Sequence, residues 1–173
     1  MAYRNKTYVC FDADQDIKYY RMLLAWSEND KFDFEIYNAH EINNLRKYSN
    51  EETIKRKLFE RLKNSKVMIV LVGENTKYLY KYVRWEIEKA IELGIPIIAV
   101  NIVEDSKGKY NRKLDDIYCP KILKETTALH IPFREKIITK AIDEWPDIHT
   151  DYINKKEIGP KIYKDFVYKD LNL

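Results

Sequence analysis

The sequence has few of the residues that interrupt helices and strands or that crosslink the chain. It contains 4 Gly and 5 Pro in 173 residues, too few for a linker-rich, collagenous or disordered protein. Its two cysteines, Cys10 and Cys119, cannot make a disulfide framework, and their spacing matches no zinc site. We therefore expect both to be small buried apolar residues. The length suits one domain of ordinary size.

Long apolar runs and a strong charge of one sign are also missing. No run approaches the roughly 20 apolar residues that span a membrane, and residues 1–6 lack the apolar core of a secretory signal. We therefore expect a cytoplasmic protein that has no membrane partner. The 31 Lys and Arg against 28 Asp and Glu leave a net charge of +3, without the basic excess of a dedicated nucleic-acid binder. No nucleic-acid partner is expected.

Tyrosine is the residue that the chain has in excess, with 14 Tyr beside 6 Phe and 3 Trp. Lys, Asn and Ile are also frequent, and all four residue types have A/T-rich codons, so genome composition is one explanation. A surface that stacks on bases or nucleotides is the other.

Strand and helix patterns alternate along the chain. The predicted strands cover 7–11, 32–37, 66–72, 95–100 and 126–131, and the predicted helices cover 16–26, 49–62, 81–94 and 137–145. Ser49 and Glu52 predict a capping box at the start of the second helix, Gly94 closes the third, and Pro146 terminates the fourth. Residues 104–120 read as a charged, irregular loop.

This alternation predicts a parallel sheet with right-handed crossovers. The expected fold is a three-layer flavodoxin-like α/β domain, with five strands in the order 2-1-3-4-5 and helices on both faces. We assign residues 1–148 to this domain and residues 149–173 to an extension that wraps its surface. Such sheets bind ligands at the carboxyl ends of their strands, where strands 1 and 3 diverge.

Familiar catalytic and metal-binding motifs are absent. The sequence has no glycine-rich dinucleotide fingerprint, phosphate loop or nucleophile elbow. Its three histidines, His40, His130 and His149, lie far apart without the spacing of metal ligands. We therefore expect neither a metal site nor a bound cofactor.

An acidic cluster, Asp12, Asp14 and Asp16, follows the first predicted strand and has two interpretations. Such carboxylates hold magnesium in response-regulator receivers, but a receiver also needs a phosphoacceptor Asp at the end of strand 3, where this chain has Gly73 and Glu74. The alternative is a solvated loop that caps the following helix.

Glu86 lies on the edge of an apolar helical stripe. Val83, Ile87 and Ala90 fall on one face of the predicted helix and must pack on the sheet, and Glu86 flanks them. The first turns of this helix lie at the carboxyl edge of the sheet, where a ligand would bind. The alternative is a boundary residue that pairs with Arg84 or Lys89.

The helix 83–94, VRWEIEKAIELG, and the strand 95–100, IPIIAV, resemble the signature of bacterial TIR-like proteins. The similarity is greatest to the ThsB proteins of the Thoeris antiphage system. It extends over residues 6–102 and leaves out the charged loop and the tail. It implies an enzyme that cleaves the bond between nicotinamide and ribose in NAD+. The ADP-ribose part would become a nucleotide signal, expected to be cyclic, that activates a separate effector after a phage-derived trigger.

The resemblance also implies a site. The family's catalytic glutamate lies on the helix after strand 3, which is the position of Glu86. The substrate-binding residues would be Phe11, Asp12, Ala13, Asn38 and His40, with Tyr82 and Trp85 as stacking partners. Asn38 and His40 replace an Asp and a Ser of relatives, so the resemblance does not define the substrate contacts or the product.

One carboxylate is sufficient for this chemistry. Glycosidases usually need an acid and a base or nucleophile, but the nicotinamide of NAD+ is already cationic and leaves without an acid. A single carboxylate can stabilise the positive charge that develops on the ribose. NAD+ is thus the substrate and not a cofactor.

Two other functions compete with this one. A TIR-like interaction module would work by self-association through an exposed Trp85, the loop 104–120 and the Tyr-rich tail. A nucleoside or nucleotide glycosidase of the deoxyribosyltransferase type also uses a carboxylate in a flavodoxin-like sheet.

Overall fold

A parallel sheet forms the centre of the fold. The structure, a computed structural model, describes residues 5–29, 34–36, 49–79 and 81–173. Its strands lie in the order β2-β1-β3-β4-β5-β6, and every neighbouring pair is parallel. They are β1 (Asn5–Cys10), β2 (Phe34–Ile36), β3 (Val67–Val72), β4 (Ile97–Asn101), β5 (Ala128–Pro132) and β6 (Lys161–Ile162). The predicted α/β class and the order of the first five strands are confirmed, and the short β6 extends the sheet beyond them.

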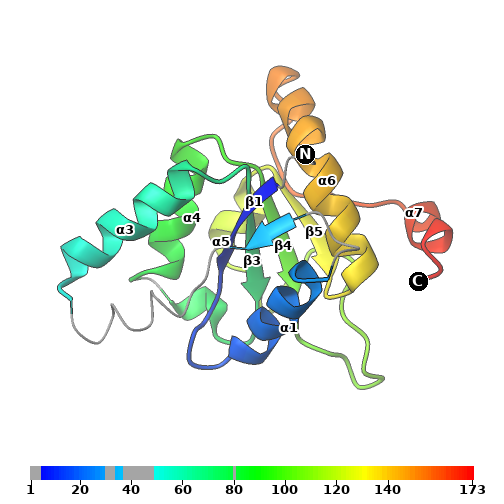
Figure 1. Cartoon of the computed structure of the whole chain (residues 1–173). Coiled ribbons are helices and arrows are strands. Elements are labelled where there is room, and N and C mark those ends of the chain that lie inside the picture. The colour runs from blue at the N-terminus through cyan, green and yellow to red at the C-terminus, as the bar shows by residue number, and fades with distance from the viewer. Residues whose placement is uncertain (1–4, 30–33, 37–48, 80) are drawn as a thin grey trace.

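Helices cover both faces of the sheet (Figure 1). They are α1 (Ile17–Ser27), α3 (Glu51–Lys63), α4 (Val83–Glu92), α5 (Lys121–Glu125), α6 (Glu135–Asn154) and α7 (Asp165–Asp170), with a 3-10 turn η1 (Thr76–Tyr78). In Figure 1, α3 and α4 lie side by side on one side of the sheet, and α1 and α6 lie on the other. The three predicted layers are therefore present.

The central strand β3 is buried on both faces, as its unbroken apolar run predicts. Val67, Ile69 and Leu71 pack with α1 and α6, whereas Met68 and Val70 pack with α3 and α4. The two faces therefore have separate cores, which we call the α1 core and the α4 core. Because side chains alternate along a strand, each strand residue belongs to one core or the other.

Helix α3 begins one residue later than the predicted capping box. Asn50, not Ser49, is the N-cap, and its side-chain oxygen accepts a hydrogen bond from the Thr53 N–H at 2.9 Å. The prediction that Ser49 caps the helix is wrong, because Asn is as good an N-cap residue as Ser. With Asn50 as the cap, Glu51 and Glu52 both lie in the first turn, where the helix dipole favours acids.

Removing this cap is expected to lower stability. Asn50→Ala should reduce the free energy of unfolding by about 1 kcal/mol, because the Thr53 N–H loses its partner. Ser49→Ala is the matched control and should leave it almost unchanged. Urea unfolding measures both variants, and a larger loss for Ser49→Ala would restore the original assignment.

Helix α6 continues through Pro146, so the prediction that it ends there is wrong. A proline inside a helix costs about 3 kcal/mol. Here the apolar face offsets that cost, because Trp145 and His149 on either side are both buried and their rings lie 5.7 Å apart. The Thr150 hydroxyl also donates to the Pro146 carbonyl at 3.0 Å. The domain boundary assigned at 148/149 falls inside this helix.

The last residues are attached to the domain through both β6 and α7. Strand β6 pairs with β5, and Tyr168 of α7 is 1% exposed within the α1 core. The Arg112 guanidinium lies 4.5 Å from the centre of the Tyr168 ring. The charged loop and the C-terminal segment therefore meet at Tyr168.

The predicted loop 104–120 has one isolated bridge, between Glu104 and Tyr110. The Asn101 side chain at the end of β4 donates to the carbonyls of Asn111 and Lys113, at 2.9 and 2.8 Å. Cys119, where the loop ends, and Cys10 in β1 are buried and unbridged, as predicted.

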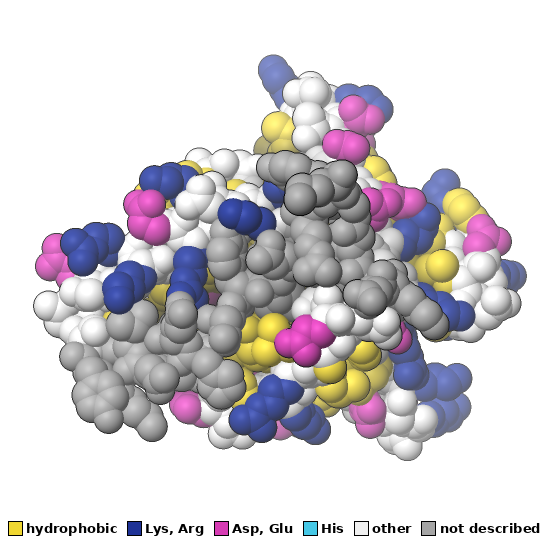
Figure 2. All heavy atoms as spheres, viewed as in Figure 1, with side chains coloured by type: hydrophobic (Ala, Val, Ile, Leu, Met, Phe, Trp, Pro, Cys, Tyr) yellow, Lys and Arg dark blue, Asp and Glu magenta, His cyan; other side chains and the backbone are white. Residues whose placement is uncertain are grey.

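The surface mixes charges of both signs. Figure 2 shows Lys and Arg side chains interspersed with Asp and Glu across the visible face. No helix in the described part of the chain has both the length and the apolar character needed to cross a bilayer.

Candidate active site

Glu86 is buried in the first turn of α4. Its side chain is 4% exposed and lies among the apolar residues Val83, Ile87 and Ala90. The helix thus turns a carboxylate toward the sheet, although the apolar pattern placed this residue only on the flank. Burying a carboxylate is costly unless partners stabilise it, so its presence here needs a partner or a function.

Tyr8 of β1 is one such partner. Its hydroxyl donates a hydrogen bond to Glu86 Oε2 at 3.0 Å, and the Tyr8 side chain is 2% exposed. Cys10, two residues along the same strand face, donates to the Val83 carbonyl at 3.8 Å. These contacts hold the start of α4 against the carboxyl half of β1. Tyr8 is not among the predicted site residues, although strand alternation places it on the face of Cys10.

The two bases of α4, Arg84 and Lys89, pair with other acids. Arg84 pairs with Glu88 at 2.8 Å, and Lys89 pairs with Glu92 at 2.6 Å, both on the exposed side of α4. The alternative, in which Glu86 is a boundary residue that pairs with Arg84 or Lys89, thus loses support, because Glu86 is buried and both bases have other partners.

Phe11 and Ala13 lie away from Glu86. Phe11 stacks on Tyr20 of α1, with ring centres 4.7 Å apart and planes 6° from parallel, and it belongs to the α1 core. Ala13 packs against the same core. Phe11 follows Cys10, which faces the α4 core, so alternation turns the Phe11 ring to the opposite face.

Asp12 closes the turn after β1. Its Oδ1 accepts hydrogen bonds from the N–H groups of Asp14 and Gln15, at 3.0 and 3.3 Å. Asp14 is exposed, whereas Asp16 is the buried N-cap residue of α1, with no cap bond from its side chain. Within the described ranges, no three His, Cys, Asp or Glu side chains are arranged to hold a metal ion.

Tyr82 and Trp85 flank Glu86 on α4 and are both half-buried against the α4 core. The Lys55 ammonium of α3 lies 5.6 Å from the centre of the Trp85 ring, and the Lys81 ammonium lies 5.4 Å from that of Tyr82. Trp85 is therefore not the exposed residue that the interaction-module hypothesis used. Asn38 and His40 lie outside the described residues.

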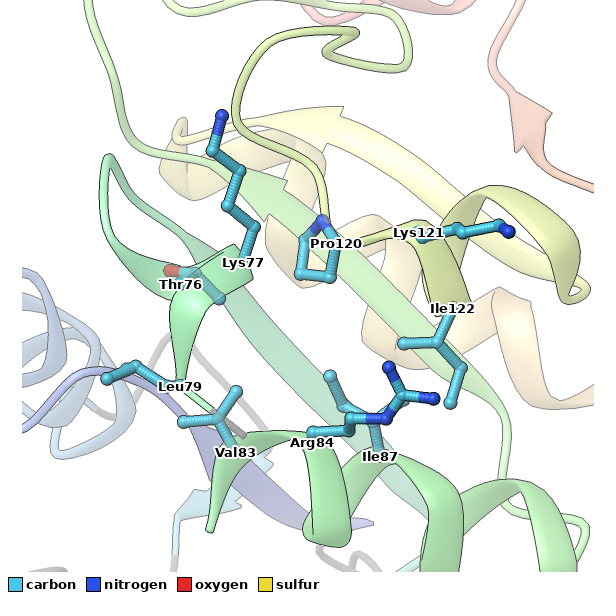
Figure 3. A pocket seen from close by; sticks show the side chains of 9 residues that line it. All are labelled: Thr76, Lys77, Leu79, Val83, Arg84, Ile87, Pro120, Lys121 and Ile122. Carbon is cyan, nitrogen blue, oxygen red and sulfur yellow. The ribbon is translucent and has the colours of Figure 1, made fainter. Parts of the chain in front are cut away.

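A small pocket opens beside the first turn of α4 (Figure 3). It is lined by Thr76, Lys77, Leu79, Val83, Arg84, Ile87, Pro120, Lys121 and Ile122. Its volume is about 60 Å³, well below the roughly 300 Å³ at which pockets for small organic ligands begin. In Figure 3 the Arg84 guanidinium lies beside Ile122. This pocket is too small to hold a dinucleotide.

Removing the Tyr8 hydroxyl should lower the free energy of unfolding more when residue 86 carries a charge than when it is neutral. Tyr8→Phe is expected to lower the free energy of unfolding by roughly 2 kcal/mol, because a buried carboxylate oxygen loses a donor. In the Glu86→Gln background the same change should cost less, because the acceptor is neutral. A double-mutant cycle by urea unfolding measures the difference, and equal costs in both backgrounds would rule out a charge-assisted bond.

Comparison with known proteins assigns the family. A family model described as Thoeris protein ThsB, TIR-like domain, matches residues 8–107. A crystal structure of a conserved protein from Enterococcus faecalis V583 is similar at 23% identity, with a TM-score of 0.48, over 66% of this chain and 69% of that one. No curated protein sequence is significantly similar. The matched residues span more than half of the chain and include the end of β1 and all of β3, β4 and the Glu86 helix, and on this basis the chain belongs to the Thoeris ThsB family of TIR-like domains.

Proposed function

We propose that the protein is an antiphage-defence enzyme that cleaves the nicotinamide–ribose bond of NAD+. The observation that carries this proposal is Glu86, a carboxylate that is 4% exposed at the start of the helix after β3 and bonded to Tyr8. Family membership supports the same chemistry, since the catalytic glutamate of the family is expected at this position. Carboxylates that are costly to bury are common at functional sites.

The reaction breaks the bond between ribose C1′ and the pyridinium nitrogen. The electron pair of that bond goes to the nitrogen, so nicotinamide leaves as a neutral molecule and positive charge develops on the ribose. Glu86 stabilises this charge or holds the ribose hydroxyls, and Tyr8 acts as a positioning residue that fixes the carboxylate. A hydroxyl of the ADP-ribose part, or water, then attacks C1′ and releases a proton.

The remaining substrate contacts are assigned by the resemblance. Asp12, Asn38 and His40 would surround the ribose and phosphates, and Tyr82 and Trp85 would supply aromatic rings next to Glu86 on the same helix. The product would be a nucleotide signal, cyclic if a hydroxyl of the same molecule attacks, that activates a separate effector in the cytoplasm. A phage-derived trigger would switch the enzyme on.

The test is nicotinamide release. The purified protein is incubated with NAD+, with and without lysate from phage-infected cells, and nicotinamide and nucleotide products are separated by chromatography. Release that depends on infection is expected. The lysate is taken from cells infected with a phage against which the complete defence system protects. If nicotinamide is not released with this lysate, the proposal is contradicted. Parallel incubation with nucleosides tests the deoxyribosyltransferase-type alternative, which predicts base release from them instead.

One observation favours the second candidate, a self-associating module. Ile158, Ile162 and Phe166 are 74%, 49% and 59% exposed in the C-terminal segment, which is unusual for large apolar side chains that lie close in sequence. Sedimentation that shifts with concentration, together with no NAD+ binding by calorimetry, would favour this function over catalysis.

A further inference from the structure

A crevice of about 340 Å³ lies at the carboxyl ends of β1, β3 and β4. Its walls come from three connections, namely residues 15–19, 73–75 and 102–104. It opens above the point where β1 and β3 lead to opposite faces of the sheet, which is the usual place for a ligand in such folds. Its volume lies within the range of pockets for small organic ligands.

The crevice is separate from Glu86. It is bordered by the first turn of α1, whose Tyr20 and Leu23 belong to the α1 core, whereas Glu86 packs among residues of the α4 core. Among the described residues, Glu86 is not part of the crevice lining. A ligand in the crevice would be additional to the NAD+ of the proposed function.

Asp16 is the buried acceptor in this crevice. Its side chain is 8% exposed, and its Oδ2 has no hydrogen-bond partner among the described residues. The N–H of Gly73, at the strand end beside Asp16, is already used, since it donates to Thr76 Oγ1 at 2.9 Å. A buried carboxylate oxygen without a donor is costly, and a ligand with hydrogen-bond donors would remove that cost.

The end of β3 is shaped to admit this carboxyl group. A Cβ atom at Gly73 would lie 2.4 Å from Asp16 Oδ2 and 2.9 Å from its Cγ. Glycine is thus the residue that lets the carboxyl group lie directly against the strand end. The missing side chain at Gly73 therefore leaves the space that the buried carboxyl group of Asp16 occupies at the wall of the crevice.

The lining is acidic although the chain is basic. Among the described residues, the lining contains three acids, Asp16, Glu74 and Glu104, and one base, Lys18, whereas the whole chain carries a net charge of +3. The Lys18 ammonium lies 4.8 Å from the centre of the Tyr19 ring. Burial, followed by the charge of Asp12, raises the pKa of Asp16 to about 6. The Asp16 carboxyl group is therefore largely ionised at neutral pH, although its Oδ2 has no hydrogen-bond donor among the described residues.

We propose that this crevice binds a small aliphatic amine, with the ammonium group donating to Asp16. An ammonium carries three donors and tolerates loose geometry, and it matches both the orphan acceptor and the acidic lining. The same lining repels phosphates. A divalent metal ion fits less well, because no three described acidic side chains have the arrangement that it needs.

The test uses putrescine, a diammonium compound, on the full chain followed by amide NMR. Saturable shifts are expected at residues 15–19 and 73–75, and 1,4-butanediol, the neutral analogue, should give none. Asp16→Asn should weaken putrescine binding by about 10-fold or more, the effect of losing one charge-assisted bond. The matched control is Glu157→Gln, which removes one exposed acid beyond α6 and should bind as the parent does.

Other outcomes overturn the proposal. They are no saturable putrescine shifts, equal binding by Asp16→Asn and Glu157→Gln, or shifts of these amides by Mg²⁺ but not by putrescine. If Asp16→Asn does not fold, the double change Glu74→Gln and Glu104→Gln, at two exposed acids of the lining, should still weaken binding. NAD+ cleavage depends on Glu86 and is measured separately, so each proposal can fail alone.

Discussion

Replacing Glu86 by Gln is expected to reduce NAD+ cleavage by at least about 100-fold, the usual effect of removing one group that stabilises transition-state charge. Gln keeps the shape of the side chain and still accepts a hydrogen bond from the Tyr8 hydroxyl, so the fold should survive. Ala would leave that hydroxyl without this acceptor and open a cavity, which would mix a loss of stability with a loss of chemistry. Nicotinamide release in the triggered reaction measures the effect.

The matched control is Glu88→Gln, on the same helix. Glu88 pairs with Arg84 on the solvent side of α4, so its neutralisation changes the charge of the helix equally but leaves the buried site intact. Its activity should remain within about 2-fold of the parent, since exposed ion pairs contribute little. Equal losses in the two variants would mean that helix charge, not the carboxylate of Glu86, affects the reaction.

The second large effect is expected in acid, at His130 of β5. This side chain is fully buried, with Nε2 3.3 Å from the Leu123 carbonyl and no partner at Nδ1 in the described structure. Burial lowers the pKa of His130 to about 4, against 6.5 for the unfolded chain. Between these values the unfolded state binds more protons. Acidification should therefore remove up to about 3 kcal/mol of stability through this group.

Asp16 has the opposite linkage. Its pKa is raised from 3.8 to about 6, so between these values the folded state binds more protons and gains up to about 3 kcal/mol as the pH falls. The two contributions should nearly cancel in the parent protein. Urea unfolding at about pH 7 and about pH 4.5 is expected to separate them. His130→Gln should become more stable in acid relative to the parent, and Asp16→Asn less stable.

The same pH dependence in both variants and the parent would contradict these pKa shifts. If both variants followed the pH dependence of the parent, neither group would have the shifted pKa that its burial produces. Thr150→Ala, an exposed hydroxyl change on α6, serves as a control for substitutions that alter no titratable group.

The architecture could be predicted from the apolar patterns of the chain. The unbroken apolar runs at 66–72 and 95–100 can be satisfied only by strands covered on both faces, and the alternation with helices then requires a parallel sheet. Gly94, with φ +69°, ends the helix region where the pattern predicts it, because glycine adopts that conformation without strain. Helical periodicity also brought Glu86 to the edge of the buried face.

Which side chains meet could not be predicted, because it depends on how distant segments pack. Tyr8 and Glu86 are 78 residues apart, and their contact depends on how α4 crosses β1. Phe11 looked like a site residue from its position after β1, but strand alternation turns it into the α1 core. Pro146 reads as a helix end, yet burial of Trp145 outweighs its local cost. Local patterns encode periodicity and burial, whereas register and crossing geometry, which join distant segments, appear only when the chain packs.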